Sequence, residues 1–169
     1  RRRINQMVVF GIDPGTAITG YSVLDESTGG NLVAIDYGVI RTPANTKQED
    51  RLKLLFNQLN SLITLHRPSS CAVEKLFFQK NVKTALSVGE ARGVIILCFA
   101  LAGVPVYEYA PVEIKQAVAG YGNADKKQVQ YMVKEILQLD EVPQPDDAAD
   151  ALAAAVCHMH SRKIIQLSE

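Results

Sequence analysis

The chain has 169 residues, of which 47% are hydrophobic, and this size and composition suit a single globular domain with a substantial core. Its longest apolar run, 94–102, is about half the roughly 20 residues needed to span a bilayer, so no membrane partner is expected. The net charge is zero, but residues 75–127 carry seven Lys or Arg against four Asp or Glu, and residues 128–169 carry three against seven. The net charge of zero therefore excludes only a nucleic-acid binder that is basic over its whole surface. Three cysteines, an odd number, favour a reducing, cytoplasmic setting.

Three strands are predicted at the start of the chain. The run 7–12 is continuously apolar, which is typical of a strand buried on both faces, and it stops at Asp13-Pro14-Gly15. Two more strands are predicted over 19–24 and 32–40, joined by a turn-rich segment. The first three strands should therefore form an antiparallel meander.

Helices and strands alternate after Pro43. Apolar residues at helical spacing between Leu52 and Ile63 predict a helix that ends before Pro68. The later predicted elements are a strand over 70–73 ending at Glu74, a helix over 82–101, a strand over 104–107, and helices over 112–118, 126–137 and 147–163. This order predicts an α/β fold with one mixed five-stranded sheet, three meander strands then parallel strands, flanked by helices. A ribonuclease-H-like arrangement is a leading candidate for this order of elements.

Two predicted strands end on an acidic residue. Asp13 follows the most apolar strand and Glu74 follows Cys-Ala-Val, a run in which a charged residue seldom occurs without a partner. The carboxyl ends of central strands face the crevice where α/β proteins bind ligands. Asp13-Pro14-Gly15 is also an ordinary turn sequence, so a purely structural role for Asp13 stays open.

Two further acids begin the last predicted helix. Asp147 and Asp150 are three residues apart and therefore share a helix face. Acids in a first turn also complement the helix dipole, and Asp146, after Pro145, is predicted to be an N-cap. The alanines that follow would let this helix lie close to the sheet, bringing its first turn within reach of Asp13 and Glu74.

Four converging carboxylates would shift toward protonation unless a cation keeps them ionised. Oxygen ligands favour Mg²⁺ or Mn²⁺ over zinc, and two such ions about 4 Å apart can hydrolyse a phosphodiester without a side-chain nucleophile. Cys157, His158 and His160 suggest zinc, but they lie within one helical turn and have no second cluster to complete four ligands. The sequence therefore predicts a magnesium site.

Several motifs then match one known family in order and spacing. They are GIDPGT at 11–16 with TGY at 19–21, VEKLFF at 73–78, KNVKTAL at 80–86, GEARG at 89–93 and DAADALA at 147–153. Together they closely resemble the RuvC family of bacterial Holliday junction resolvases, over about residues 7–160. Residues 1–169 would then form a single ribonuclease-H-like nuclease domain with its core at about 7–160.

The resemblance implies a homodimer that resolves four-way DNA junctions by paired symmetric nicks in homologous recombination and DNA repair. It implies two Mg²⁺ ions per active site, replaceable by Mn²⁺, branch-migration partners RuvA and RuvB, and a cytoplasmic, nucleoid-associated location. By position, the metal-binding acids would be Asp13, Glu74, Asp147 and Asp150, with Asp13 bridging both ions. Some family members carry a histidine at the position of Asp147.

The resemblance also implies residues that bind DNA. Phe77 matches an aromatic at the junction centre that could stack on an unpaired base, although it could equally be a core residue. Lys115 and Lys126 match basic positions near the active site and should contact the scissile phosphate or the neighbouring backbone, with Lys126 counted among the catalytic residues. Further backbone contacts, each of which could instead be ordinary surface charge, are predicted at Lys80, Lys83, Arg92 and Lys127.

Two segments leave their role open. Ala85, Gly89 and Gly93 form a small-residue stripe that suits either a dimer interface or packing on the chain's own sheet. The loop Gly120-Tyr121-Gly122-Asn123 keeps the family's glycines but has its own bulky residue at Tyr121, which would alter how the loop meets DNA.

Two other functions remain as alternatives. Asp13-Pro14-Gly15-Thr16 followed by a hairpin also resembles the phosphate-binding start of actin-like ATPases and sugar kinases, although those proteins need two such domains. A junction-binding protein without catalysis, in which the acids are structural, is the other alternative.

Overall fold

The computed structural model describes residues 7–75 and 82–168, with only the backbone at 82–83 and 165–168. Its strands are β1 (Val9–Asp13), β2 (Ile18–Glu26), β3 (Leu32–Arg41), β4 (Ser70–Glu74) and β5 (Val106–Tyr109). Its helices are α1 (Gln48–His66), α2 (Val82–Leu101), α3 (Pro111–Ala119), α4 (Lys126–Ile136) and α5 (Asp146–Ser168).

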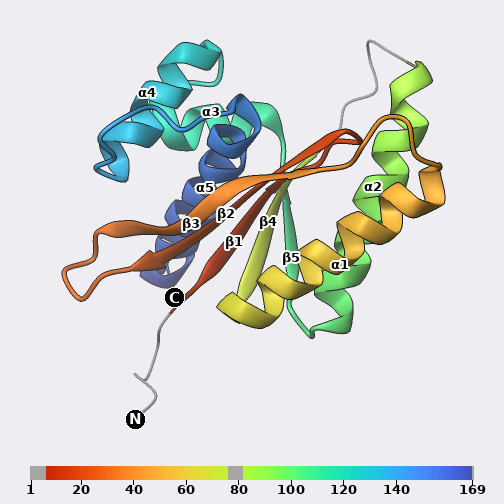
Figure 1. Ribbon diagram of the computed structural model, residues 1–169. Coiled ribbons are helices and arrows are strands. Elements are labelled where there is room, and N and C mark those ends of the chain that lie inside the picture. The colour runs from red at the N-terminus through yellow and green to blue at the C-terminus, as the bar shows by residue number, and fades with distance from the viewer. Residues whose placement is uncertain (1–6, 76–81, 169) are drawn as a thin grey trace.

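One five-stranded sheet organises the described residues, in the order β3-β2-β1-β4-β5. β1 pairs antiparallel with β2, which pairs antiparallel with β3, whereas β4 lies parallel to both β1 and β5. Helices α1 and α2 cover one face, and α3, α4 and α5 lie on the other (Figure 1). The predicted mixed sheet with three meander strands followed by parallel strands is confirmed.

The sheet separates two apolar cores. Phe10, Ile12 and Val73 point toward α1 and α2, where Leu59 and Ile95 are completely buried. On the opposite face the core is formed by α3, α4 and α5 against the other side of the same strands. Central strands buried on both faces explain the continuous apolar runs of β1 and β4 in the sequence.

The fifth strand lies later in the chain than predicted. The fifth strand was expected at 104–107, but β5 begins at Val106, where pairing with β4 starts. Gly103 has a φ of 69°, and the Val104 amide donates to the Phe99 carbonyl, so Val104 belongs to the turn that closes α2.

Helix α2 leaves much of its surface uncovered. Segment Thr84–Leu101 has the length and apolar composition of a membrane span, with a mean hydropathy of 1.6. Only 22% of this segment is buried inside the protein. A Cβ added at Gly89 or at Gly93 would meet no atom within 4 Å. At Gly89 and Gly93 the small-residue stripe is therefore not packed against the chain's own sheet.

Candidate functional site

Asp13 and Glu74 lie side by side because their strands are parallel neighbours. The register pairs Ile12 with Val73, and each acid is the next residue and the last of its strand. Adjacent strands in a sheet lie about 4.8 Å apart, so both carboxylates emerge from one rigid edge. The structure brings these two predicted residues together.

The first turn of α5 is held against the same edge by close backbone contact. Gly20 is the β-ladder partner of Asp13, and a Cβ on Gly20 would lie 1.9 Å from the Asp147 carbonyl oxygen. One turn further along, Ser22 Oγ donates to the Ala151 carbonyl at 2.9 Å. Only a residue without a side chain at position 20 permits this approach, which carries Asp147 and Asp150 to Asp13.

Burial and like charge act together on Asp13. Removal from water, followed by the negative charges of Asp150, Glu74 and Asp147, raises the pKa of Asp13 from 3.8 to about 8. Lys126 opposes this shift without cancelling it. At neutral pH the Asp13 carboxyl is therefore mostly protonated as long as no further cation binds beside it.

The neighbouring acids are perturbed in the same direction. Burial and then the charge of Asp150 raise the pKa of Glu74, against the opposing charges of Lys115 and Lys126. Burial also raises the pKa of Asp150, although Lys126 acts against the shift. Such a set of mutually repelling, partly buried carboxylates is a common feature of functional sites.

Lys126, the first residue of α4, lies between two acids of α5. Its Nζ is 3.1 Å from Asp146 Oδ2 and 3.5 Å from Asp150 Oδ2. Burial works against its charge, but the Asp146 and Asp150 carboxylates outweigh burial and raise the pKa of Lys126. The structure thus brings Lys126 to the acids, as predicted.

The prediction that Asp146 is the N-cap of α5 is wrong. Asp146 is the first residue of α5 and not its N-cap, and its carboxylate accepts from Gln130 Nε2 at 3.1 Å as well as from Lys126. Its hydrogen bond with Lys126 lowers the pKa of Asp146. Asp146 therefore ties α5 to α4 and helps to position Lys126.

A cavity of about 270 Å³ opens beside these residues. It connects the acids with the basic side chains of α3 and α4, since Glu74, Asp150, Lys115 and Lys126 all line it. The remaining walls come from α3, α4, α5 and the loop before α4, including Ile114, Ala124, Val129 and Ala153.

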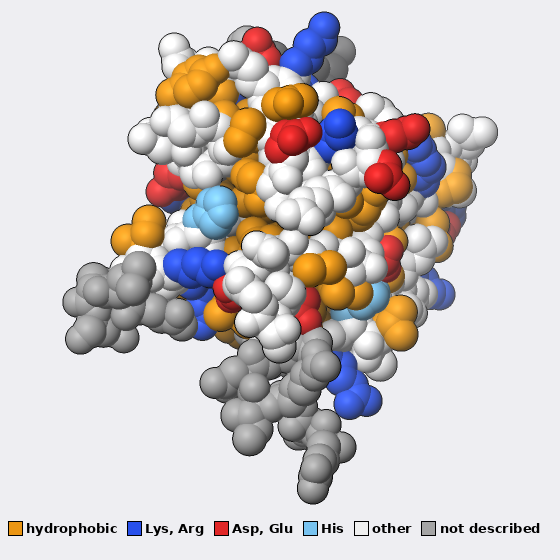
Figure 2. All heavy atoms as spheres, turned by 90° about the vertical axis from the view of Figure 1, so that its left-hand side faces the viewer, with side chains coloured by type: hydrophobic (Ala, Val, Ile, Leu, Met, Phe, Trp, Pro, Cys, Tyr) orange, Lys and Arg blue, Asp and Glu red, His pale blue; other side chains and the backbone are white. Residues whose placement is uncertain are grey.

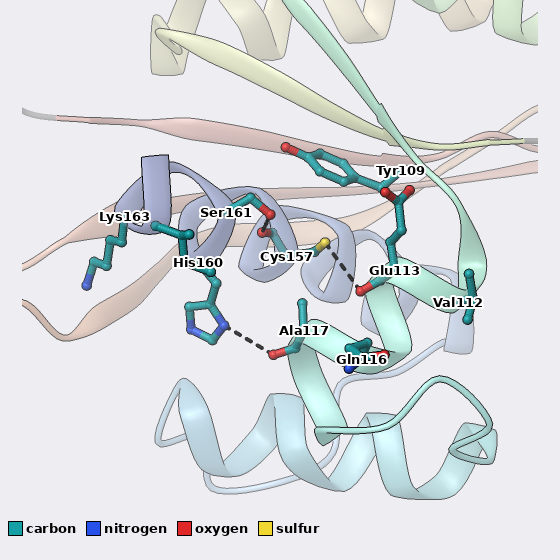
Figure 3. Close-up of a pocket in the computed structure, with 10 residues that line it drawn as sticks. Tyr109, Val112, Glu113, Gln116, Ala117, Cys157, His160, Ser161 and Lys163 are labelled. Atoms are coloured by element: carbon teal, nitrogen blue, oxygen red, sulfur yellow. Dashed lines mark hydrogen bonds between the residues drawn. The ribbon is translucent and has the colours of Figure 1, made fainter. Parts of the chain in front are cut away.

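A larger cavity of about 710 Å³ lies between α3 and α5, away from the acids (Figure 3). The residues that suggested zinc are engaged here in protein hydrogen bonds: Cys157 Sγ lies 3.8 Å from the Glu113 carbonyl, and His160 Nδ1 lies 3.2 Å from the Ala117 carbonyl. His158 is buried and bonded through both ring nitrogens.

The other predicted DNA-binding residues differ in exposure, and some lie outside the described residues. Lys127 is exposed on α4. On the face shown in Figure 2, acidic and basic side chains lie intermixed. The Arg92 guanidinium pairs with Glu108 of β5 and is 17% exposed, which leaves it less available to DNA than the prediction assumed. Phe77 and Lys80 lie outside the described residues, as does the side chain of Lys83.

The loop between α3 and α4 presents Tyr121, whose side chain is exposed. Gly120 ends α3 with a φ of 89°, and Asp125 caps α4 through a reciprocal pair of bonds with Gln128. The loop adjoins the cavity through Ala124 and Asp125, whereas Tyr121 does not line it.

Sequence reasoning missed the residues that bring α5 to the sheet. Gly11 and Gly20 admit the α5 backbone, and Ser22 anchors it. Two glycines in otherwise strong strands were the available signal, because glycine inside a strand often marks a close backbone approach.

The donor set fits a hard divalent cation. All four acids offer carboxylate oxygens, and a cation would supply the positive charge that the raised pKa of Asp13 shows to be lacking. Among the described residues, no three or more His, Cys, Asp or Glu side chains already converge as a finished cage. Closure around an ion therefore requires side-chain movement on a backbone that is already in place.

This fold and site define a class, the ribonuclease-H-like metal-dependent hydrolases. The family model of crossover junction endodeoxyribonuclease RuvC matches residues 9–158. The chain belongs to the RuvC family.

Individual relatives agree over nearly the full length. A crossover junction endodeoxyribonuclease RuvC of Heliobacterium modesticaldum is 56% identical, and the match covers 92% of this chain and 95% of the relative. A crossover junction endodeoxyribonuclease RuvC of Desulfitobacterium hafniense is 52% identical, and the match covers 94% of this chain and 96% of the relative. The structure of Thermus thermophilus RuvC superposes with a TM-score of 0.88 at 36% identity, covering 94% of this chain and 96% of that one. The structure of Thermus thermophilus RuvC in complex with a Holliday junction substrate superposes with a TM-score of 0.86 at 34% sequence identity, with the same coverage. The actin-like ATPase and the non-catalytic binder receive no support.

Proposed function

We propose that this chain resolves four-way DNA junctions by hydrolysing one phosphodiester in each of two strands, with Asp13, Glu74, Asp147 and Asp150 as ligands of two Mg²⁺ ions. The observation that carries the proposal is the clustering of acids from β1, β4 and α5 around Asp13, whose pKa is raised to about 8. A nuclease of this family is metal-dependent, and Mn²⁺ should replace Mg²⁺ because both prefer carboxylate oxygen.

Bound ions would activate water and stabilise the leaving oxygen. The protein's own part is to hold its carboxylates on a rigid strand edge and on the first turn of α5. Asp13, which interacts electrostatically with the other three acids, would be the ligand that both ions share. Lys126 and Lys115 line the same cavity and would contact the scissile phosphate, or its neighbours, as it approaches.

DNA contacts outside the site follow from the resemblance to the family. Phe77 would stack on an unpaired base at the junction centre, and basic side chains would hold the phosphate backbone without reading sequence. These proposed contacts are Lys80, Lys83, Lys127 and, with its Glu108 pairing as a restraint, Arg92.

A homodimer is proposed on the uncovered face of α2. Leu86, Leu97 and Leu101 are 72%, 51% and 69% exposed, and together with Gly89 and Gly93 they follow one stripe at helical spacing. Small residues between leucines allow two helices to cross closely. A twofold axis there would present two identical sites to two equivalent strands of a junction.

The wider setting is also part of the proposal. Residues 1–169 would act as one nuclease domain with its core at about 7–160, in the cytoplasm and associated with the nucleoid. Branch-migration proteins of the RuvA and RuvB type are the proposed partners, by family resemblance alone.

The test is a cleavage assay on a synthetic mobile four-way junction with Mg²⁺. Paired nicks at symmetric positions, absent when the metal is chelated and absent on a linear duplex of the same sequence, are the expected result. Junction binding without nicks under Mg²⁺ or Mn²⁺ would contradict the proposal, and ATP hydrolysis without DNA would revive the actin-like alternative.

A further inference from the structure

We propose that a buried hydrogen-bond network of Ser70, His158 and Tyr109, named here the His158 network, sets the position of α5 along the sheet and thereby the position of Asp150 relative to Glu74. These are positioning residues that touch neither substrate nor metal. The inference rests on the proposed assignment of Asp150 and Glu74 to the active site.

The His158 network joins α5 to two strands at once. His158 Nε2 lies 3.0 Å from Ser70 Oγ at the start of β4, and His158 Nδ1 lies 2.6 Å from Tyr109 Oη at the end of β5. The His158 ring also packs on Tyr107, with ring centroids 4.6 Å apart. The Tyr109 side chain extends from β5 along α5 (Figure 3). Ser70 is 0% exposed and His158 is 1% exposed.

The histidine is held neutral in this position. Burial, followed by the charge of Arg162, lowers the pKa of His158 to about 4. A neutral imidazole has one donor and one acceptor, and here both nitrogens have a hydroxyl partner. Both bonds are therefore satisfied, and breaking one would leave a buried polar group unpaired, which fixes the histidine firmly.

Helix α5 meets β1 through small residues, although it also buries Leu152, Val156 and Met159. A Cβ added at Gly11 would lie 2.1 Å from the Ala151 carbonyl oxygen and 2.9 Å from Ala155 Cβ, so alanines form this contact. Methyl groups provide few ridges to interlock with grooves, so packing alone opposes sliding weakly. Polar bonds then determine the position of the helix: Ser22 to the Ala151 carbonyl near the acids, and the His158 network further along.

The geometry relates the network directly to the acids. From Ser70 to Glu74, β4 rises about 13 Å, and from Asp150 to His158, α5 rises about 12 Å. The two segments run in opposite directions and have nearly equal lengths. Holding His158 on Ser70 therefore places Asp150 opposite Glu74, and a shift of α5 along its axis would displace Asp150 from this position by the same distance.

The test compares network variants with a matched control. Ser70→Ala and Tyr109→Phe each remove one hydroxyl, His158→Leu removes both bonds, and His158→Gln keeps a polar atom that can still reach Ser70. Tyr107→Phe is the control, because it makes the same change on the same strand outside the network. The measurements are the cleavage rate over a Mg²⁺ titration, junction binding without divalent cation, and the melting temperature.

His158→Leu should raise the Mg²⁺ concentration at half-maximal rate about tenfold and lower the rate by a similar factor. Ser70→Ala and Tyr109→Phe should show smaller shifts in the same direction, and His158→Gln should recover part of the loss. Junction binding should stay within about twofold of wild type, because the DNA surface is unchanged. Tyr107→Phe should match wild type in every measurement.

A merely structural role would lower the melting temperature and leave the Mg²⁺ requirement unchanged, which would overturn the inference. If His158→Leu fails to fold, the two hydroxyl deletions decide the question alone. Asp150→Asn separates this inference from the site assignment. Normal cleavage by Asp150→Asn would refute the site, whereas an inactive Asp150→Asn beside network variants with wild-type metal dependence would refute the network alone.

Discussion

Asp13 is the residue on which the electrostatics of the site converge. Its carboxyl lies at the end of a buried strand, next to Glu74 and beneath the first turn of α5. Each of the other three acids raises its pKa further, beyond the effect of burial. A carboxyl in this position is costly to ionise without a cation, which makes Asp13 the most informative residue to change.

Asp13→Asn should abolish cleavage and retain junction binding, and it should stabilise the metal-free protein. Between pH 3.8 and about 8 the folded chain holds a proton at Asp13 that the unfolded chain has lost, so the free energy of unfolding of the wild type falls as pH rises through this window. Asp13→Asn has no carboxyl to titrate at this position, so its free energy of unfolding does not fall for this reason. Its advantage in melting temperature should grow from about pH 4 to about pH 8 and then level off.

Asp140→Asn, which alters an exposed acid outside the site, is the matched control and should cut normally. Wild-type cleavage by Asp13→Asn would show that the site is wrongly assigned. A melting advantage that is the same at every pH would show that the cause is something other than the Asp13 charge.

Lys126 and Lys127 are adjacent in sequence, yet only Lys126 contacts the acids. Lys126→Met should lower the cleavage rate strongly, because it removes the ammonium group beside Asp150 and its proposed contact to the reacting phosphate. Lys127→Met should leave the rate at saturating DNA nearly unchanged and weaken binding, reducing the slope of log affinity against log salt by about 1. Equal effects of the two changes on rate and on salt dependence would contradict their separate roles.

The site depends on how closely α5 approaches β1 and β2. Gly20→Ala should push the first turn of α5 away from Asp13, since the new Cβ would collide with the Asp147 carbonyl. We expect a loss of about 1–3 kcal/mol in the free energy of unfolding and a fall in cleavage of about 100-fold. Gly29→Ala, in the β2–β3 turn, has room for its Cβ and should change neither. Full activity in a folded Gly20→Ala variant would refute this role.

The elements themselves were predictable because their signals are local. Continuous apolar runs identified β1 and β4, and helical spacing identified α1. The acids could be nominated because a charge at the end of a buried strand conflicts with burial. The N-cap at Asp146 was predicted wrongly because the competing partners, Lys126 and Gln130, belong to another helix.

The His158 network was invisible in sequence for a similar reason. Ser70, Tyr109 and His158 lie on three separate elements, and only the folded arrangement shows that they meet. His158 looked instead like one member of a possible zinc cluster with Cys157 and His160. A pattern of ligand types within one helical turn does not reveal that the imidazole already has two partners.

The uncovered face of α2 predicts that the protein is a dimer. Leu97→Glu should convert the proposed dimer to a monomer, because a charge would be buried between two leucine stripes. Leu65→Glu is the matched control, since Leu65 is 72% exposed on α1, outside the stripe. Molar mass from light scattering during gel filtration provides the measurement.

The same variant tests whether cleavage is paired. A monomeric Leu97→Glu protein should nick single strands slowly and lose the simultaneous second cut, which a junction placed in a supercoiled plasmid can report. A wild-type protein of monomer mass would refute the dimer on this face.

Asp13, Glu74, Asp147 and Asp150 are proposed to hold the ions that perform the cleavage. Anomalous diffraction from crystals soaked in Mn²⁺ is the sharpest test of this assignment. The prediction is two peaks about 4 Å apart at the carboxyl ends of β1 and β4, with Asp13 shared between them and Asp150 bound to one. Ordered carboxylates with no peak between them, or Mn²⁺ bound only elsewhere on the protein, would contradict the account.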